Sequence, residues 1–167
     1  LDSIMANNMP AEIGRSCLTP LIGVYGGVAG DFTVTKVCDS EYFMVGSGLG
    51  ERYHQRFFNM IDKPADTTLE VATDRIAGFN VAGPKSRSVL QRLTNEDLSN
   101  DAFRFMHSRS INVAGVDCLA IRVSFTGDLG WELHCAESDQ IKLFTALLDA
   151  AEALGGGAVG SRALGSL

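Results

Sequence analysis

Short runs rich in β-branched and apolar residues recur along the chain and restrict the fold classes that it can adopt. Runs of this length, bounded by Gly, Pro, Asn or Asp, are typical of strands. The expected strands are Asp31–Val37, Tyr42–Val45, Ile76–Val81, Ser110–Val113, Cys118–Ser124 and Trp131–Cys135. The turn Ala114-Gly115-Val116-Asp117 joins two of these runs and predicts a hairpin.

Helical signals are fewer, and they begin at Glu51, Pro84 and Ser138. The first predicts a helix to about Ile61, and Pro84 suits the first turn of the second. The inward residues expected of the second helix are Val89, Leu90 and Leu93. In the third, Ser138 is the expected N-cap, and the expected core face is Ile141, Phe144, Leu148 and Ala151. Strands in hairpins and helices that do not alternate with them favour an α+β fold with mixed or antiparallel sheets and packed helices.

Composition excludes several classes of protein. The chain has 167 residues and a net charge of −6, with its Lys and Arg scattered rather than gathered in the basic stripe that binds nucleic acid. No apolar run reaches the ~20 residues of a membrane span. The four cysteines lack metal-ligand spacing. We therefore expect a cytosolic protein without nucleic-acid, membrane or metal partners.

The chain shows no repeat or low-complexity tract that would divide it. The Pro/Asp cluster at Ile61–Thr67 is short enough for a surface loop. We expect no internal domain boundary, and the opening on Leu and the ending GSRALGSL predict a piece of a longer protein.

Asp31 follows Gly26, Gly27 and Gly30 at the mouth of an expected strand. Glycine lets a ligand approach the backbone closely, so a carboxylate here can be presented to a substrate. A tight turn with a solvated Asp explains the same residues. The residues alone leave both interpretations open.

Glu132 interrupts an apolar, strand-like run beside the only tryptophan of the chain. A carboxylate on a sheet face needs hydrogen-bond donors. Two adjacent N–H groups of a flat heterocycle would match its oxygens. A guanidinium from Arg122 or Arg162 would match them equally well, as a structural ion pair.

The glycines from Gly46 to Gly50 are spaced GxGxG rather than GxGxxG, so a plain strand-to-helix turn is favoured over a dinucleotide site. His54, His107 and His134 have no Ser or Cys placed as a nucleophile, and none of the three is assigned a role.

Several separated stretches resemble one known family. They are LDSIMANNMP, LTPLIGVYGGVAGDFTVTKV, GFNVAGPKSRSVLQRLTNEDLSN and IRVSFTGDLGWELH. In this order they are similar to the tetrahydrofolate-binding aminomethyltransferase domain of the glycine cleavage T-protein and of dimethylglycine and sarcosine dehydrogenases. ERYHQRFF and GDLGWEL are closer to the dehydrogenase branch.

The resemblance implies one-carbon transfer to tetrahydrofolate, giving 5,10-methylenetetrahydrofolate. It implies that Asp31 is the catalytic carboxylate and that Glu132 binds the pterin edge. The further folate-binding residues that it implies are Phe125, where the family often has Tyr, Ser47, where the T-protein branch has Asn, and Arg162.

The implied partners are folate, a small methylated amine donor and a flavin dehydrogenase domain. Relative to the family, residues 1–167 form a partial domain that lacks the opening strands and the C-terminal barrel. A non-catalytic folate-binding domain and a structural domain that supports a flavin dehydrogenase remain as alternatives.

Overall fold

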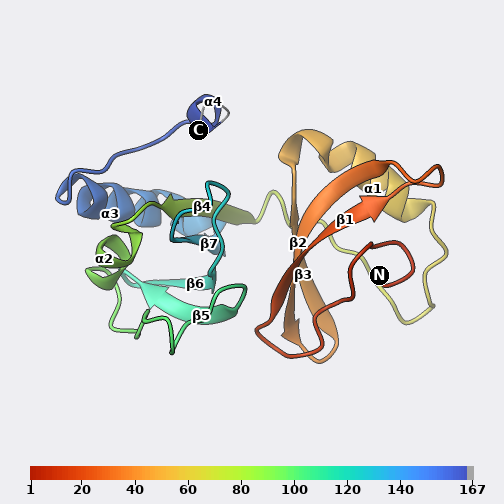
Figure 1. Ribbon diagram of the computed structural model, residues 1–167, viewed down its shortest axis with the longest axis horizontal. Helices are drawn as coiled ribbons and strands as arrows, with labels where there is room; N and C mark the ends of the chain where they lie inside the picture. The colour runs from red at the N-terminus through yellow and green to blue at the C-terminus, as the bar shows by residue number, and fades with distance from the viewer. Residues whose placement is uncertain (165–167) are drawn as a thin grey trace. The chain divides into compact units, whose positions relative to one another are not determined.

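A computed structural model describes residues 1–164, whose contacts fall into two compact units, Leu1–Glu70 and Val71–Leu167 (Figure 1). Each unit has its own hydrophobic core. The expectation of a chain without an internal boundary is therefore wrong at the level of packing. The reason is that residues 62–75 contain no helix or strand and are almost all exposed, so this segment adds little to either core.

The first unit is a three-stranded antiparallel sheet with one helix. Its elements are β1 (Ser16–Ile22), β2 (Val28–Cys38), β3 (Glu41–Gly46), η1 (Gly48–Gly50) and α1 (Glu51–Asn59). The strand order is β1-β2-β3, and the core gathers Met5, Leu21, Phe32, Val34 and Phe58. Strand β1 is not among the strands expected from the sequence, and it contains Pro20. Pro20 is tolerated because β1 lies at the edge of the β1-β2-β3 order.

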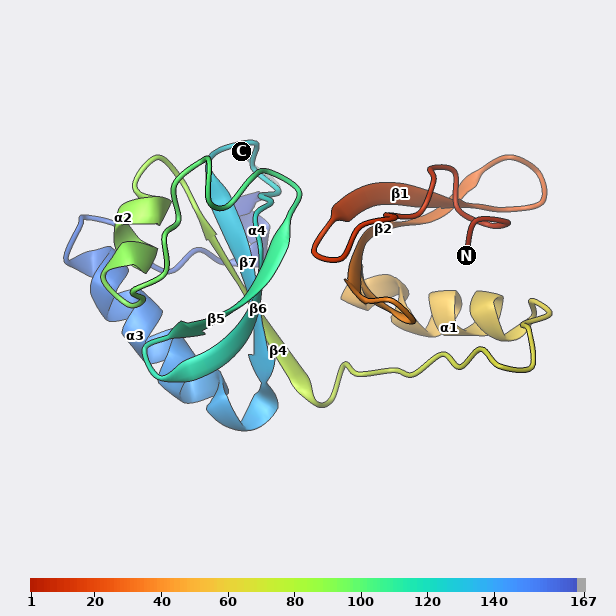
Figure 2. The ribbon, with the colours of Figure 1, turned by 90° about the horizontal axis from the view of Figure 1, so that it is seen from below.

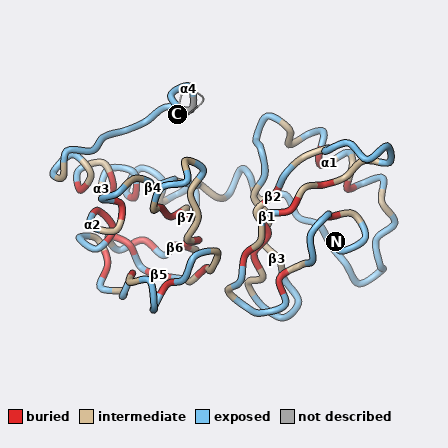
Figure 3. The backbone as a smooth tube through the Cα atoms, viewed as in Figure 1, coloured by how far each residue is buried: buried red, intermediate tan, exposed pale blue. Residues whose placement is uncertain are grey.

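The second unit is a four-stranded antiparallel sheet of order β4-β7-β6-β5. Its strands are β4 (Ile76–Ala82), β5 (Ser108–Val113), β6 (Val116–Ile121) and β7 (Gly130–Ala136). Its helices are α2 (Ser86–Gln91), η2 (Glu137–Asp139), α3 (Gln140–Glu152) and α4 (Ser161–Leu164). Helices α2 and α3 cover one face of the sheet (Figure 2), and the buried segments gather there (Figure 3). The observed architecture confirms the α+β prediction, with antiparallel sheets and packed helices.

Helix α3 is turned relative to its expected orientation. The buried residues are Leu143, Leu147 and Ala150, whereas Ile141 and Phe144 are 79% and 43% exposed. The expected core face is therefore wrong, because the helix is apolar on more than one side and spacing alone does not choose between the sides. The expected N-cap is also wrong, since Ser138 lies in η2 and Asp139 occupies the cap position.

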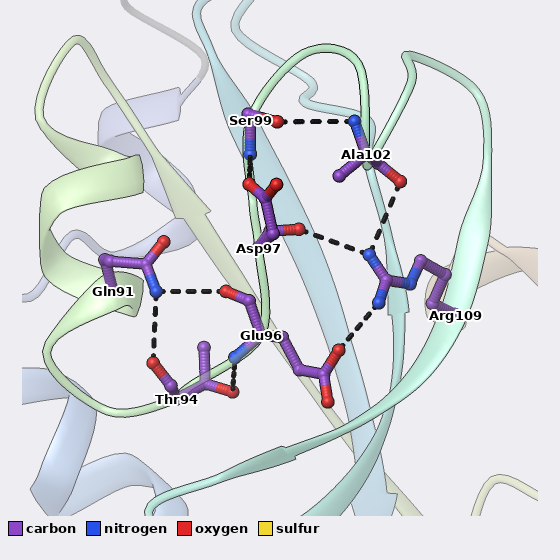
Figure 4. Close-up of polar contacts among 7 residues, drawn as sticks. All are labelled: Gln91, Thr94, Glu96, Asp97, Ser99, Ala102 and Arg109. Atoms are coloured by element: carbon purple, nitrogen blue, oxygen red, sulfur yellow. Dashed lines mark hydrogen bonds and ion pairs between the residues drawn. The ribbon is translucent and has the colours of Figure 1, made fainter.

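A polar network ties the segment between α2 and β5 to the sheet (Figure 4). Arg109 on β5 forms an ion pair with Glu96, 2.6 Å between Nη2 and Oε2, and also donates to the backbone carbonyl of Asp97. The amide of Ser99 donates to the Asp97 carboxylate at 2.8 Å. Hydrogen bonds from Ser99 lower the pKa of Asp97.

No helix in residues 1–164 is long and apolar enough to cross a bilayer.

Candidate functional site

Glu132 lies in β7 on the sheet face away from α2 and α3. Successive strand residues point to opposite faces, and its neighbours Trp131 and Leu133 are buried in the core under the helices. In register, Glu132 stands between Asn80 of β4 and Ile121 of β6.

The partner of Glu132 on this face is His134, two residues along the same strand. Glu132 Oε2 lies 3.6 Å from His134 Nε2, with the two side chains 22% and 10% exposed. Oε2 is buried and accepts no hydrogen bond from the described residues. A buried carboxylate oxygen without a donor is costly. The site therefore offers an acceptor to a ligand that brings N–H groups.

Gly78 of β4 makes room for the imidazole of His134. The two residues are paired in register, and a Cβ at Gly78 would lie 3.2 Å from Nδ1 of His134. From the sequence, His134 had no assigned role, and its place beside Glu132 and Gly78 was not predicted. The available signal was the spacing of Glu132 and His134, which places them on one face of a strand.

Arg122 does not form the structural ion pair with Glu132 that was considered from the sequence. Its guanidinium donates to the carbonyl of Phe103 and, at 2.7 Å, to Asn100 Oδ1. It also lies 5.7 Å from the centre of a ring of the buried Trp131. Burial, and then the charge of Arg87, lower the pKa of Arg122. The guanidinium of Arg122 thus contacts Phe103, Asn100 and Trp131, and it does not pair with the carboxylate of Glu132.

An open hollow of about 250 Å³ is lined mainly by residues of the loop between β6 and β7. Its lining includes Arg122, Ser124 and Gly130, the last on the same face of β7 as Glu132. Phe125, expected to wall a folate pocket, is 77% exposed in this loop and is not among the lining residues. Arg162 is exposed on α4. Within residues 1–164, the ion pair of Glu132 is with His134 and involves neither Phe125 nor Arg162.

Asp31 and Ser47 lie in the first unit, at one end of its sheet. The β2–β3 pairing ends at Phe32 opposite Gly46, so Asp31 and Ser47 are each one residue beyond the last pair. Both residues are exposed. Asp31 lies inside β2, opposite Pro20 of β1, whereas the sequence predicted that the strand begins at Asp31. The register therefore places two of the expected residues at the same end of the sheet, Asp31 within β2 and Ser47 directly after β3.

The structure defines an α+β protein with two antiparallel sheets, and each sheet carries one of the two expected carboxylates, Asp31 in β2 and Glu132 in β7. The chain belongs to the GCVT N-terminal domain family, whose family model matches residues 1–167. This finding confirms the resemblance stated from the sequence.

Relatives include mitochondrial dimethylglycine dehydrogenase of Mus musculus, 34% identical over 172 residues that cover 100% of this chain and 19% of that protein. An aminomethyltransferase of Thermoanaerobacter sp. (strain X514) is 25% identical over 156 residues, 93% of this chain and 42% of that protein. The chain thus spans about a fifth of the length of the dehydrogenase relatives.

A solved structure of heterotetrameric sarcosine oxidase from Corynebacterium sp. U-96, in complex with pyrrole 2-carboxylate, shares the fold. Its TM-score is 0.62 at 17% identity, over 92% of this chain and 71% of that one.

Proposed function

We propose that this chain binds a reduced folate and serves in the transfer of a one-carbon unit to it, giving 5,10-methylenetetrahydrofolate, as a module of a protein that oxidises a small methylated amine. Family membership and the names of the relatives, dimethylglycine dehydrogenase and aminomethyltransferase, support the proposal. The observation that carries it is the buried Glu132 Oε2, which accepts no hydrogen bond from the described residues.

Glu132 would recognise the pterin edge. A pterin presents a ring N–H beside an exocyclic NH₂, and a carboxylate accepts from both at once. Replacing the carboxylate would leave those donors unpaired, at a cost of about 1–3 kcal/mol each. His134 lies on the same face and would help to keep Glu132 in place.

Asp31 would act where the carbon is received. Tetrahydrofolate supplies the nitrogen atoms that take up the one-carbon unit. An exposed carboxylate beside such a nitrogen stabilises the positive charge that develops there and can accept the proton that leaves. General-base assistance of this kind is typically worth about 10²–10⁴-fold in rate. Ser47, at the same end of the sheet, would contribute a hydroxyl to binding.

The test is calorimetric titration of the full-length protein with tetrahydrofolate. Glu132→Gln keeps the shape of the side chain but replaces one acceptor oxygen with a donor, so we expect binding to weaken at least ~10-fold. Glu137→Gln is the matched control, since Glu137 is an exposed carboxylate just beyond the same strand. Equal affinity in the wild type and in Glu132→Gln would refute the proposed role, and absence of binding in the wild type would refute the function.

A further inference from the structure

His54, to which no role was assigned from the sequence, is buried in the first unit. It lies on α1 and is 7% exposed. Its ring packs edge-on against Phe32 of β2, with centroids 4.8 Å apart, and against Tyr53 at 5.9 Å. These contacts seat the imidazole between the helix and the sheet.

The free edge of the ring is wedged between two glycines from different elements. A Cβ at Gly30 would lie 2.4 Å from His54 Nε2, and a Cβ at Gly50 would lie 2.5 Å from Cε1. Cβ atoms essentially never come this close to other heavy atoms. Only glycine therefore fits at positions 30 and 50 while the imidazole stays where it is.

Each of these glycines is close in the chain to a residue of the proposed folate site. Gly30 directly precedes Asp31 in β2. Gly50 ends the turn that Ser47 begins, and the Gly50 amide donates to the Ser47 carbonyl at 3.0 Å. Asp31 and Ser47 stand at the same end of the β2–β3 ladder. The imidazole of His54 thus packs against the backbone at Gly30, next to Asp31, and at Gly50, in the same turn as Ser47.

We propose that His54 is a positioning residue that sets the spacing between Asp31 and Ser47. This inference rests on the proposed function for the identity of the ligand, but the packing that carries it does not. A shift of about 1 Å in such a spacing is enough to cost roughly 10²-fold in rate.

The first test needs no folate. In the full-length protein, Gly50→Ala should push the imidazole toward Gly30 and shift the amide resonances of Gly30 and Asp31. Gly48→Ala is the matched control, because a Cβ at Gly48 has nothing within 4 Å. In a His54→Asn background, which removes the outer edge of the ring, the effect of Gly50→Ala on Asp31 should disappear. Unchanged Asp31 resonances in Gly50→Ala, or a shift that persists without the imidazole, would overturn the inference.

The second test measures transfer kinetics with tetrahydrofolate in the same variants. Gly50→Ala should lower kcat/KM by about 10-fold or more, Gly48→Ala should change it less than twofold, and the losses from Gly50→Ala and His54→Asn should not add. Additive losses would overturn the inference. If the wild type neither binds nor uses tetrahydrofolate, the proposed function fails and the resonance experiment alone decides the role of His54.

Discussion

At the scale of single residues, neighbours in the sequence lie in different environments of the fold. Trp131 and Glu132 are adjacent, yet the first is buried under the helices while the second lies on the opposite face with His134. Asp31 follows Gly30, whose missing side chain makes room for His54. Substitutions at the buried positions should therefore lower the free energy of unfolding, whereas substitutions of the exposed carboxylate should affect the proposed one-carbon transfer.

For Asp31 we expect an effect on transfer rather than on folding. Asp31→Asn keeps the shape of an exposed side chain but removes its charge and basicity. Tetrahydrofolate binding in the full-length protein should persist, while one-carbon transfer should fall about 10²–10⁴-fold. Rapid-quench measurement of 5,10-methylenetetrahydrofolate checks this, with the exposed Asp39→Asn as control. Equal turnover in Asp31→Asn would rule out the catalytic role.

For Cys118 we expect a pH dependence of stability. Burial, and then the nearby Cys135, raise the pKa of the Cys118 thiol to about 12. Well below pH 9 the thiol is protonated in both the folded and the unfolded chain. Between pH 9 and about 12 the unfolded chain loses this proton first, so the free energy of unfolding falls as the pH rises.

Urea denaturation at several pH values between 8 and 11 checks this prediction. Cys118→Ala should flatten the decline, and Cys38→Ser, at an exposed cysteine, should leave it unchanged. A decline of the same slope in Cys118→Ala would contradict the assignment.

At the scale of elements, packing partners decide how a helix is turned. In α3 the buried residues include Leu143 and Leu147, which join the core with Leu133 of β7. Phe144 lies to the side, 6.0 Å from Phe79 between ring centroids. The turn between β5 and β6 agrees with the sequence prediction of a hairpin, since Val113 and Val116 close the pairing.

The orientation of α3 predicts opposite outcomes for two similar substitutions. Leu143→Ala should lower the free energy of unfolding by about 2–5 kcal/mol, because it empties part of the core. Ile141→Ala should change it by no more than about 0.5 kcal/mol, because Ile141 is exposed. Denaturation followed by the emission of Trp131, in the same core, measures both. Comparable losses would mean that the helix is turned as the spacing predicted.

At the scale of the whole molecule, the chain folds as two units with separate cores, joined through an exposed segment. Glu70 ends the first unit and is exposed. A glutamate-specific protease should therefore cut the native chain early after Glu70, giving fragments that begin at Leu1 and Val71. Mass spectrometry of the digest checks this.

The fragment from Val71 should keep its fold, because it contains the complete sheet and helices of the second unit. Its Trp131 emission should remain that of a buried indole until denaturant is added. Early cleavage after Glu132 within β7, or an exposed indole in the fragment, would contradict the division into units. The cytosolic location stays a prediction, and the matched mouse relative is named as mitochondrial.

The amino-acid sequence alone determined most strands, the three main helices, the hairpin and the family, because these features leave local periodicity or contiguous motifs. Tertiary structure decided that Ser16–Ile22 forms the edge strand β1, which face of α3 is buried, and that the chain has two separate cores. It also placed His54 of α1 between Gly30 and Gly50. Such contacts join residues from different elements or depend on which face of an element is buried. Only the folded chain brings those backbones close enough to select one arrangement.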